Sequence, residues 1–357
     1  MKKFIASAAL LSFLSFGWIS AQQLAAFEDN RQFFHVFDGG EIRQLESLPV
    51  KEYRVARNFL LWVNNIGQFK MYENGYTKVL REVAPSRYTT SDHLLAYELG
   101  GQLFVYERKR SRNISNFASN YILNDSIIAF FDFNAGLNVY YHGRTRNLEV
   151  FDATNIEVGK NIVAYLDNMQ QFYVFWGGEN NNLDHLQPTS FKTGRNTCAY
   201  VDNYGRFKIF HKGMVIDADP LTPQDYQVGD DMVAWVNRNR QFMVFEDGII
   251  TMVEDLVPER YQLTDGVIAY EMPNRHFKAY YKGETQILES YIPDDYKIDN
   301  ETLVWVDYMN NLHALSYGKR VKPANRIVSG GFDVIVDVIQ SNVNMYRPQF
   351  YYDGQVY

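Results

Sequence analysis

Short apolar runs of four to six residues alternate with polar turns along nearly the whole chain. Residues 226–260 show the pattern clearly, because turn-forming stretches such as Gly229-Asp230-Asp231 and Glu246-Asp247-Gly248 bound the runs. Runs this short predict β-strands, since an amphipathic helix needs a longer periodic segment. Four strands are expected in this stretch: Tyr226–Val228, Met232–Val236, Phe242–Phe245 and Ile249–Val253.

The same four-strand unit recurs with a period of about 35 residues. An aromatic residue near the end of the second strand marks the unit nine times, with seven spacings of 35 and one of 33. These residues are Phe27, Trp62, Tyr97, Phe130, Tyr165, Tyr200, Trp235, Tyr270 and Trp305. A fixed period of this length indicates an array of equivalent supersecondary units. The run before each aromatic lacks polar alternation, which predicts strands covered on both faces by stacked sheets.

In most units an apolar strand ends in Ala followed by an aromatic, as at Ala234-Trp235, and the next strand leads into a Gly turn. This pattern resembles the bacterial TolB-like and WD-like β-propeller repeats over residues 23–357. The unit is shorter than a WD repeat and lacks the Gly-His and Trp-Asp signatures. The resemblance implies an all-β propeller of eight or nine four-stranded blades. An open, curved array of the same sheets is the alternative.

The two ends of the repeat array carry partial units. Eight complete units fill residues 51–330, whereas residues 23–50 lack a first strand and residues 331–357 form a degenerate unit. We expect these two partial units to close the ring by pairing in one sheet, because closure protects sheet edges.

The amino terminus has the pattern of a targeting segment. Lys2 and Lys3 precede an uncharged, largely apolar run, Phe4–Ala21. This pattern predicts a secretory signal peptide over residues 1–21, with a membrane anchor as the alternative. The mature domain would then be residues 22–357, without a further membrane-spanning helix. We therefore expect an exported protein of a bacterial periplasm, cell surface or extracellular space.

Composition narrows the possible functions. The 26 Tyr, 25 Phe and 5 Trp exclude a typical disordered chain. A net charge of −7 argues against a nucleic-acid partner. The single cysteine, Cys198, lies in an apolar run and is expected to be buried rather than reactive. The seven histidines show no metal-type spacing, so no metal site is expected, and no cofactor or catalytic motif is evident.

Candidate binding residues are the side chains that break the repeat in turn positions. Tyr141, His142, Trp176 and Tyr281 lie at equivalent turns of three units. Their rings can stack on a glycan or a peptide, or they can cover the edge of a neighbouring unit. The primary functional hypothesis is a non-enzymatic binding module or scaffold of the cell envelope, with a protein or glycan partner. The alternatives are a multivalent lectin and a glycan-processing hydrolase or lyase.

Overall fold

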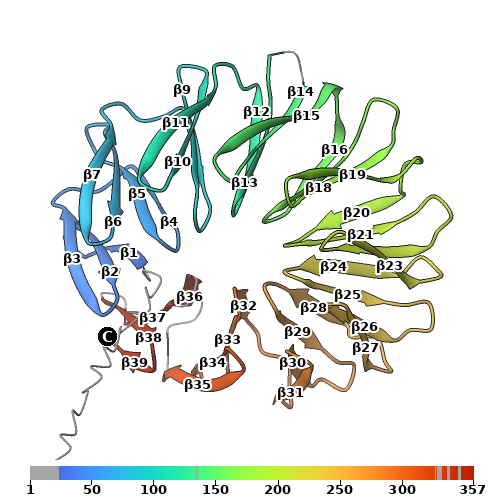
Figure 1. The fold of residues 1–357 in the computed structure, drawn as a ribbon. Coiled ribbons are helices and arrows are strands. Elements are labelled where there is room, and N and C mark those ends of the chain that lie inside the picture. The colour runs from blue at the N-terminus through green and yellow to red at the C-terminus, as the bar shows by residue number, and fades with distance from the viewer. Residues whose placement is uncertain (1–23, 134–135, 326, 328–331, 336–337, 345–346) are drawn as a thin grey trace, which may run out of the picture.

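The computed structural model describes residues 24–357 except 134–135, 326, 328–331, 336–337 and 345–346. The predicted signal peptide, residues 1–21, lies outside the described residues. All regular secondary structure of the described residues is β-strand. Consecutive strands pair antiparallel in ten sheets, here called blades 1 to 10. Figure 1 shows the blades arranged as a ring, with the first strand of the four-stranded blades near the ring axis.

The strands of the first five blades are as follows. Blade 1 contains β1 (Leu24–Glu28), β2 (Phe34–Asp38) and β3 (Glu41–Glu46). Blade 2 contains β4 (Glu52–Val55), β5 (Phe59–Val63), β6 (Phe69–Glu73) and β7 (Tyr76–Arg81). Blade 3 contains β8 (Arg87–Thr90), β9 (Leu95–Leu99), β10 (Gln102–Glu107) and β11 (Arg110–Ser115). Blade 4 contains β12 (Asn120–Asn124), β13 (Ile127–Phe131), β14 (Gly136–Tyr141) and β15 (Arg144–Asp152). Blade 5 contains β16 (Thr154–Val158), β17 (Ile162–Leu166), β18 (Phe172–Trp176) and β19 (Glu179–Asp184).

The other five blades have four strands each. Blade 6 contains β20 (Ser190–Thr193), β21 (Thr197–Val201), β22 (Phe207–His211) and β23 (Met214–Asp219). Blade 7 contains β24 (Asp225–Gly229), β25 (Met232–Val236), β26 (Phe242–Glu246) and β27 (Ile249–Glu254). Blade 8 contains β28 (Arg260–Leu263), β29 (Val267–Glu271), β30 (Phe277–Tyr281) and β31 (Glu284–Glu289). Blade 9 contains β32 (Tyr296–Asp299), β33 (Thr302–Val306), β34 (Leu312–Ser316) and β35 (Lys319–Ala324). Blade 10 contains β36 (Phe332–Ile335), β37 (Val338–Asn344), β38 (Arg347–Tyr352) and β39 (Gln355–Val356).

The antiparallel order gives the ring two distinct faces. In each four-stranded blade, the turns that join strands one to two and three to four lie on one face, here called the hairpin face. The turns that join strands two to three, and the segments that connect successive blades, lie on the opposite connector face. Every part of the repeat is thus assigned to the ring axis, the rim or one of the two faces.

The core lies between blades rather than inside any one of them. The second and third strands are almost wholly buried, and each apolar cluster combines side chains from adjacent blades. Between blades 6 and 7, for example, Phe207 contacts Tyr226 and Trp235 at ring-centroid distances of 5.0 and 5.5 Å. The small Ala199 and the strand residue Val233 complete this interface. The aromatic repeat positions are therefore mainly packing positions, each contributing about 1.5–3 kcal/mol on burial.

The propeller architecture is confirmed, but the expected blade number was too low. Each partial terminal unit forms its own sheet, so the ring has ten blades rather than eight or nine. The sequence-based expectation that the two end units pair in one sheet was wrong, because β1–β3 and β36–β39 form separate sheets. Phe37 of blade 1 instead stacks on Phe350 of blade 10, with ring centroids 4.6 Å apart, and Ala25 and Val338 pack around them. Separate sheets bury both apolar faces of each end unit, and side-chain packing, not strand pairing, closes the ring.

Among the described residues, the structure contains no helix of sufficient length and apolar character to cross a bilayer.

Candidate functional site

Seven charged residues and one asparagine from equivalent turns meet near the ring axis on the hairpin face. Each follows the first strand of its blade, and the spacing is 35 residues with one interval of 33. We call them the axial cluster: Arg57, Asp92, Asp125, Lys160, Arg195, Asp230, Asp265 and Asn300. Most of them line a hollow of about 440 Å³ together with neighbouring turn residues, whereas Asp125 and Lys160 line a smaller hollow of about 280 Å³.

Three ion pairs of the axial cluster, Lys160–Asp230, Lys160–Asp265 and Arg195–Asp125, join blades that are not neighbours, whereas Arg195–Asp230 joins the adjacent blades 6 and 7. The Lys160 ammonium contacts Asp230 at 2.9 Å and also Asp265, which lies 105 residues further along the chain. Arg195 contacts Asp230 at 3.2 Å and Asp125, 70 residues earlier, at 3.2 Å. Because blades two or three apart cannot pack directly, these contacts span the ring near its axis. The cluster therefore holds the inner edges of blades 4 to 8 together.

Close backbone approach brings these turns together. The Lys160 amide donates to the Gly194 carbonyl oxygen at 3.2 Å, and the Asp231 amide donates to the Arg195 carbonyl oxygen at 3.0 Å. A Cβ atom at Gly194 would overlap the carbonyl group of Gly229 in the next blade. Glycine is thus required here by the proximity of two backbones, and the approach places the charged side chains within contact distance.

Burial shapes the acid–base properties of the axial cluster. Desolvation and then repulsion from Asp265 raise the pKa of Asp230 to about 6, against the attraction of Lys160 and Arg195. Burial also raises the pKa of Asp125, although His93 and Arg195 oppose the shift. A carboxyl group that titrates near pH 6 can exchange protons at neutral pH. Here, however, Asp230 is occupied by ion pairs with Lys160 and Arg195, an arrangement suited to holding blades together.

The four sequence-predicted binding residues do not converge. Tyr141 and His142 belong to blade 4, Trp176 to blade 5 and Tyr281 to blade 8, all on the hairpin face. The Tyr141 ring meets Phe175 of blade 5 edge-on at 5.6 Å. His142 has a left-handed φ of 48° in the turn and contacts the Tyr141 ring at 4.1 Å.

The other two predicted aromatics also cover the next blade. Trp176 contacts Phe210 of blade 6 at 6.2 Å and donates its Nε1–H to Asn196 at 3.0 Å. The Tyr281 hydroxyl donates to Glu301 of blade 9, and its ring lies against Gly318 of the same blade. These contacts match the interpretation in which the rings cover the edge of a neighbouring unit. A ligand-binding role for the four residues remains a prediction.

Tyr141, Trp176 and Tyr281 each lie at the last residue of the third strand of their blade. In much of the ring, the residue type at this position matches the residue that it contacts in the third strand of the next blade. Where the third strand of the next blade carries Tyr, the matched position is an acid that accepts the hydroxyl proton at 2.6–2.9 Å. Where the next blade carries Phe, the position is aromatic. The hydrogen-bonded pairs are Tyr72–Asp38, Tyr106–Glu73, Tyr140–Glu107 and Tyr280–Glu246, and the ring pairs are Phe175–Tyr141, Phe210–Trp176 and Phe245–His211.

This matching makes a testable prediction at the interface of blades 7 and 8. Tyr280→Phe removes the donor that Glu246 accepts at 2.9 Å, and we expect the free energy of unfolding to fall by about 1–2 kcal/mol. Tyr76→Phe, at an exposed tyrosine, should change it by less than about 0.5 kcal/mol. Urea denaturation of both variants measures the difference. Equal stability of the two variants would show that the matched hydrogen bond contributes nothing.

A ring of exposed apolar residues on the connector face was missed by the sequence reasoning. Seven of them recur at the same repeat position, at intervals of 34 or 35 residues, and are 44–67% exposed. We call them the connector residues: Leu48, Val83, Phe117, Phe151, Leu186, Leu221 and Leu256. A signal for them is present in the sequence, because five of them lie one or two residues before a proline in the connecting segments.

Turn tips on the same face add further exposed apolar groups. Ile66, Phe133, Met169, Tyr204 and Tyr308 lie in turns between the second and third strands, and all are more than 70% exposed. Phe133 of blade 4 contacts the connector residue Phe117 with ring centroids 6.1 Å apart. Turn tips and connector residues thus form one apolar surface region at this part of the ring.

Acidic and amide side chains in these same turns accept hydrogen bonds from backbone amides of the turn. Asp202 Oδ1 accepts the amide protons of Tyr204 and Arg206 at 2.9 Å each, and Asp307 and Asp167 have equivalent contacts. These hydrogen bonds match the structural interpretation of the repeated Asp and Asn residues, which shape the turn.

Three comparisons with known proteins were made. It is similar to the computationally designed Ika8 protein (11% identity, 93% of this chain and 99% of that chain, TM-score 0.36). It is also similar to AztD of Citrobacter koseri (10% identity, 76% and 94%, TM-score 0.34) and to the CRINKLY WD40 ectodomain of the Arabidopsis thaliana receptor kinase ACR4 (8% identity, 75% and 98%, TM-score 0.35). No curated protein matches the chain significantly. The family model described as the 10-bladed beta propeller domain matches residues 18–357, and the chain therefore belongs to this family of ten-bladed β-propellers.

Proposed function

We propose that this propeller is an exported, non-enzymatic scaffold that binds a protein partner through its connector face. The observation that carries the proposal is the ring of seven exposed connector residues at one repeat position. Their identity varies among Leu, Val and Phe, whereas their apolar character and exposure are retained. Exposed apolar surface of this kind is typical of protein interaction sites. Export rests on the signal-peptide pattern of residues 1–21.

The chemistry of the connector residues favours a protein over a glycan. Five of the seven are aliphatic, and aliphatic side chains do not offer the flat ring face on which a sugar stacks. The hollow beside Phe117 and Phe133 has a volume of about 450 Å³ and few polar groups in its lining. It therefore suits an apolar side chain of a partner. These features support contacts distributed around the face of the ring rather than one small-molecule site.

Charge complementarity further defines the partner. Lys51 is the exposed base of the described connecting segments, which are residues 47–51, 82–86, 116–119, 185–189, 220–224, 255–259 and 290–295. The exposed acids of these segments are Glu82, Asp255, Glu259, Asp294 and Asp295. The turns between strands two and three of the same face add the exposed bases Arg206, Arg238, Arg240 and Arg275, so charges of both signs surround the apolar residues. We therefore expect a partner surface that combines apolar side chains with charges of both signs.

The ion pairs of the axial cluster support the non-enzymatic part of the proposal. Asp230 and Asp265 both contact Lys160, and Asp125 contacts Arg195. A catalytic pair of carboxyls needs oxygens that reach a substrate. Here the oxygens face cations of the same chain, and the cluster has an evident structural role.

The proposal predicts that three serines on the connector face weaken partner binding strongly. Leu186→Ser, Leu221→Ser and Leu256→Ser together should weaken capture of the partner from envelope extract roughly 100-fold, at ~1 kcal/mol for each lost apolar contact. Quantitative pull-down, followed by titration of the captured protein, measures the effect.

The control variant alters the opposite face to the same extent. Tyr76, Met214 and Ile249 are exposed residues that begin the fourth strand of their blades beside the hairpin face. Changing all three to Ser should leave capture unchanged. Loss of capture in this variant but not in the connector variant would contradict the proposal. Glycan-array binding that depends on the connector leucines would replace the protein partner with a glycan.

A further inference from the structure

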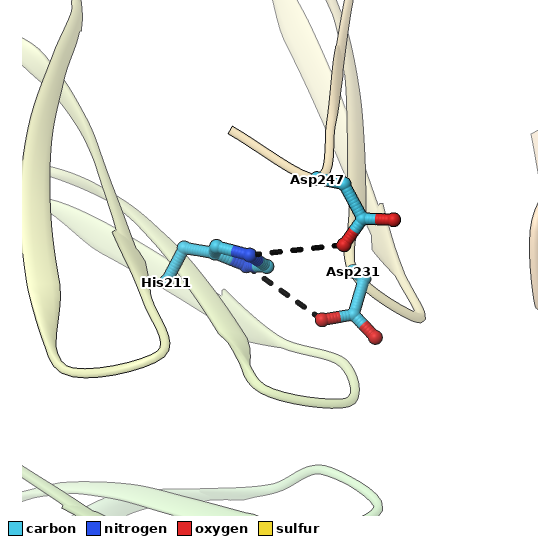
Figure 2. A group of neighbouring side chains, drawn as sticks. All are labelled: His211, Asp231 and Asp247. Carbon is cyan, nitrogen blue, oxygen red and sulfur yellow. Dashed lines mark ion pairs between the residues drawn. The ribbon is translucent and has the colours of Figure 1, made fainter. Parts of the chain in front are cut away.

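Three potential metal ligands meet between blades 6 and 7 on the hairpin face. His211 ends β22, Asp231 lies in the β24–β25 turn and Asp247 lies in the β26–β27 turn. Figure 2 shows the imidazole directed at both carboxylates. Nδ1 lies 3.8 Å from Asp231 Oδ1, and Nε2 lies 4.0 Å from Asp247 Oδ1. Linear spacing did not predict this group, because it forms only when the blades are stacked.

The imidazole is held in place from its other side. His211 is only 4% exposed, and Thr197 Oγ1 lies 3.1 Å from its Nδ1. The Nε2 atom is directed toward Asp247, and the described residues offer it no hydrogen bond. Strands β17 and β25 begin with Ile162 and Met232 where β21 begins with Thr197, so the two adjacent blades lack this hydroxyl. A second hydrogen bond that orients the ring is typical of metal-ligating histidines.

The carboxylates are also oriented, and they already bind a cation. The Asn196 amide donates to both oxygens of Asp231 at 3.1 and 3.2 Å. The Lys212 ammonium contacts Asp231 Oδ1 at 3.1 Å and Asp247 Oδ1 at 2.9 Å. Lys212 is a half-exposed side chain that can rotate into solvent. Its single charge leaves the two carboxylates with a net charge of −1, whereas a divalent ion would neutralise them.

We propose that His211, Asp231 and Asp247 form a binding site for one divalent cation of the zinc type, which enters by displacing the Lys212 ammonium. One imidazole nitrogen with two carboxylates suits Zn²⁺, whereas Ca²⁺ and Mg²⁺ prefer oxygen ligands alone. Water would complete a four-coordinate site. The site is independent of the connector face, so it extends the proposed function without relying on it.

Isothermal titration of the full chain with ZnCl2 tests the site. We expect one Zn²⁺ per chain, with binding at least about tenfold weaker in Asp247→Asn and about tenfold weaker in Thr197→Val. Asp247 is exposed, so its substitution leaves the fold intact. Asp353→Asn, at the equivalent turn of blade 10, is the matched control and should bind as the wild type does.

Lys212→Gln separates a metal site from a simple ion pair. Removal of the competing ammonium should strengthen Zn²⁺ binding several-fold, because the ion no longer has to displace a bound cation. Absence of saturable Zn²⁺ binding, or equal affinity of the wild type, Asp247→Asn and Lys212→Gln, would overturn the proposal. Either result would leave Lys212 as the permanent partner of the two carboxylates.

Discussion

Phe37→Ala is expected to lower the free energy of unfolding by about 3–5 kcal/mol and to loosen blades 1 and 10 together. Phe37 is fully buried, stacks on Phe350 at 4.6 Å and contacts Tyr357 at 5.4 Å. These contacts join the two ends of the chain, which share no strand pairing. Denaturant titration measures the free energy, and amide hydrogen exchange in β1–β3 and β36–β39 measures the loosening.

A buried phenylalanine elsewhere in the ring provides the control. Phe245→Ala should cost a similar free energy, because Phe245 is also fully buried. Its neighbours belong to blades 6 and 7, so the faster exchange should appear there and leave blades 1 and 10 protected. If Phe37→Ala destabilised the protein without faster exchange in blade 10, ring closure would not depend on the Phe37–Phe350 contact.

Lys160→Met should destabilise the protein by roughly 2–3 kcal/mol at pH 7, since it leaves Asp230 and Asp265 without their shared cation. The loss of one partner of a fully buried pair costs about 3–5 kcal/mol, and the partial exposure of this pair reduces the effect. The pKa of Asp230 is raised to about 6 in the folded state, above its ordinary 3.8. Its ionisation therefore opposes folding increasingly as the pH rises from about 4 through 6.

Because Lys160 lowers the pKa of Asp230, its removal raises that pKa further, so the deficit of Lys160→Met should be small below pH 6, where Asp230 is protonated in both proteins, and should grow as the pH rises toward 8. Lys282→Met removes an exposed ammonium that contacts Glu301 at 3.3 Å and should cost less than about 1 kcal/mol. Thermal unfolding of both variants between pH 5 and 8 measures the dependence. A deficit that stays constant across this range would contradict the assignment of Asp230 as the titrating group.

Local patterns were sufficient to predict the strands and their packing. A continuous run such as Met232–Val236 can be buried only when both faces of its sheet are covered, so stacked blades followed directly from the apolar pattern. Blade number did not follow, because a unit that lacks one strand can either pair with another partial unit or form its own sheet. The contacts of Phe37 and Phe350, over 300 residues apart, decide between these outcomes.

The candidate sites depend on the curvature of the ring, which the sequence pattern does not contain. Lys160 and Asp265 are equivalent residues of units three apart, and a linear reading places both in solvent-exposed turns. His211 and Asp231 meet only because adjacent blades stack in register. Conversely, Trp176 looked exposed as a turn residue, but the next blade supplies Phe210 and Asn196 as its neighbours.

The central claim, that the connector face binds the partner, is tested most directly by a footprint of the captured complex. Hydrogen exchange of the propeller, with and without the partner, should show new protection in the segments around Leu186, Leu221 and Leu256 and in the turns around Met169 and Tyr204. The hairpin face should be unchanged. Protection confined to the hairpin face, around the axial cluster or the Trp176 turn, would contradict the account.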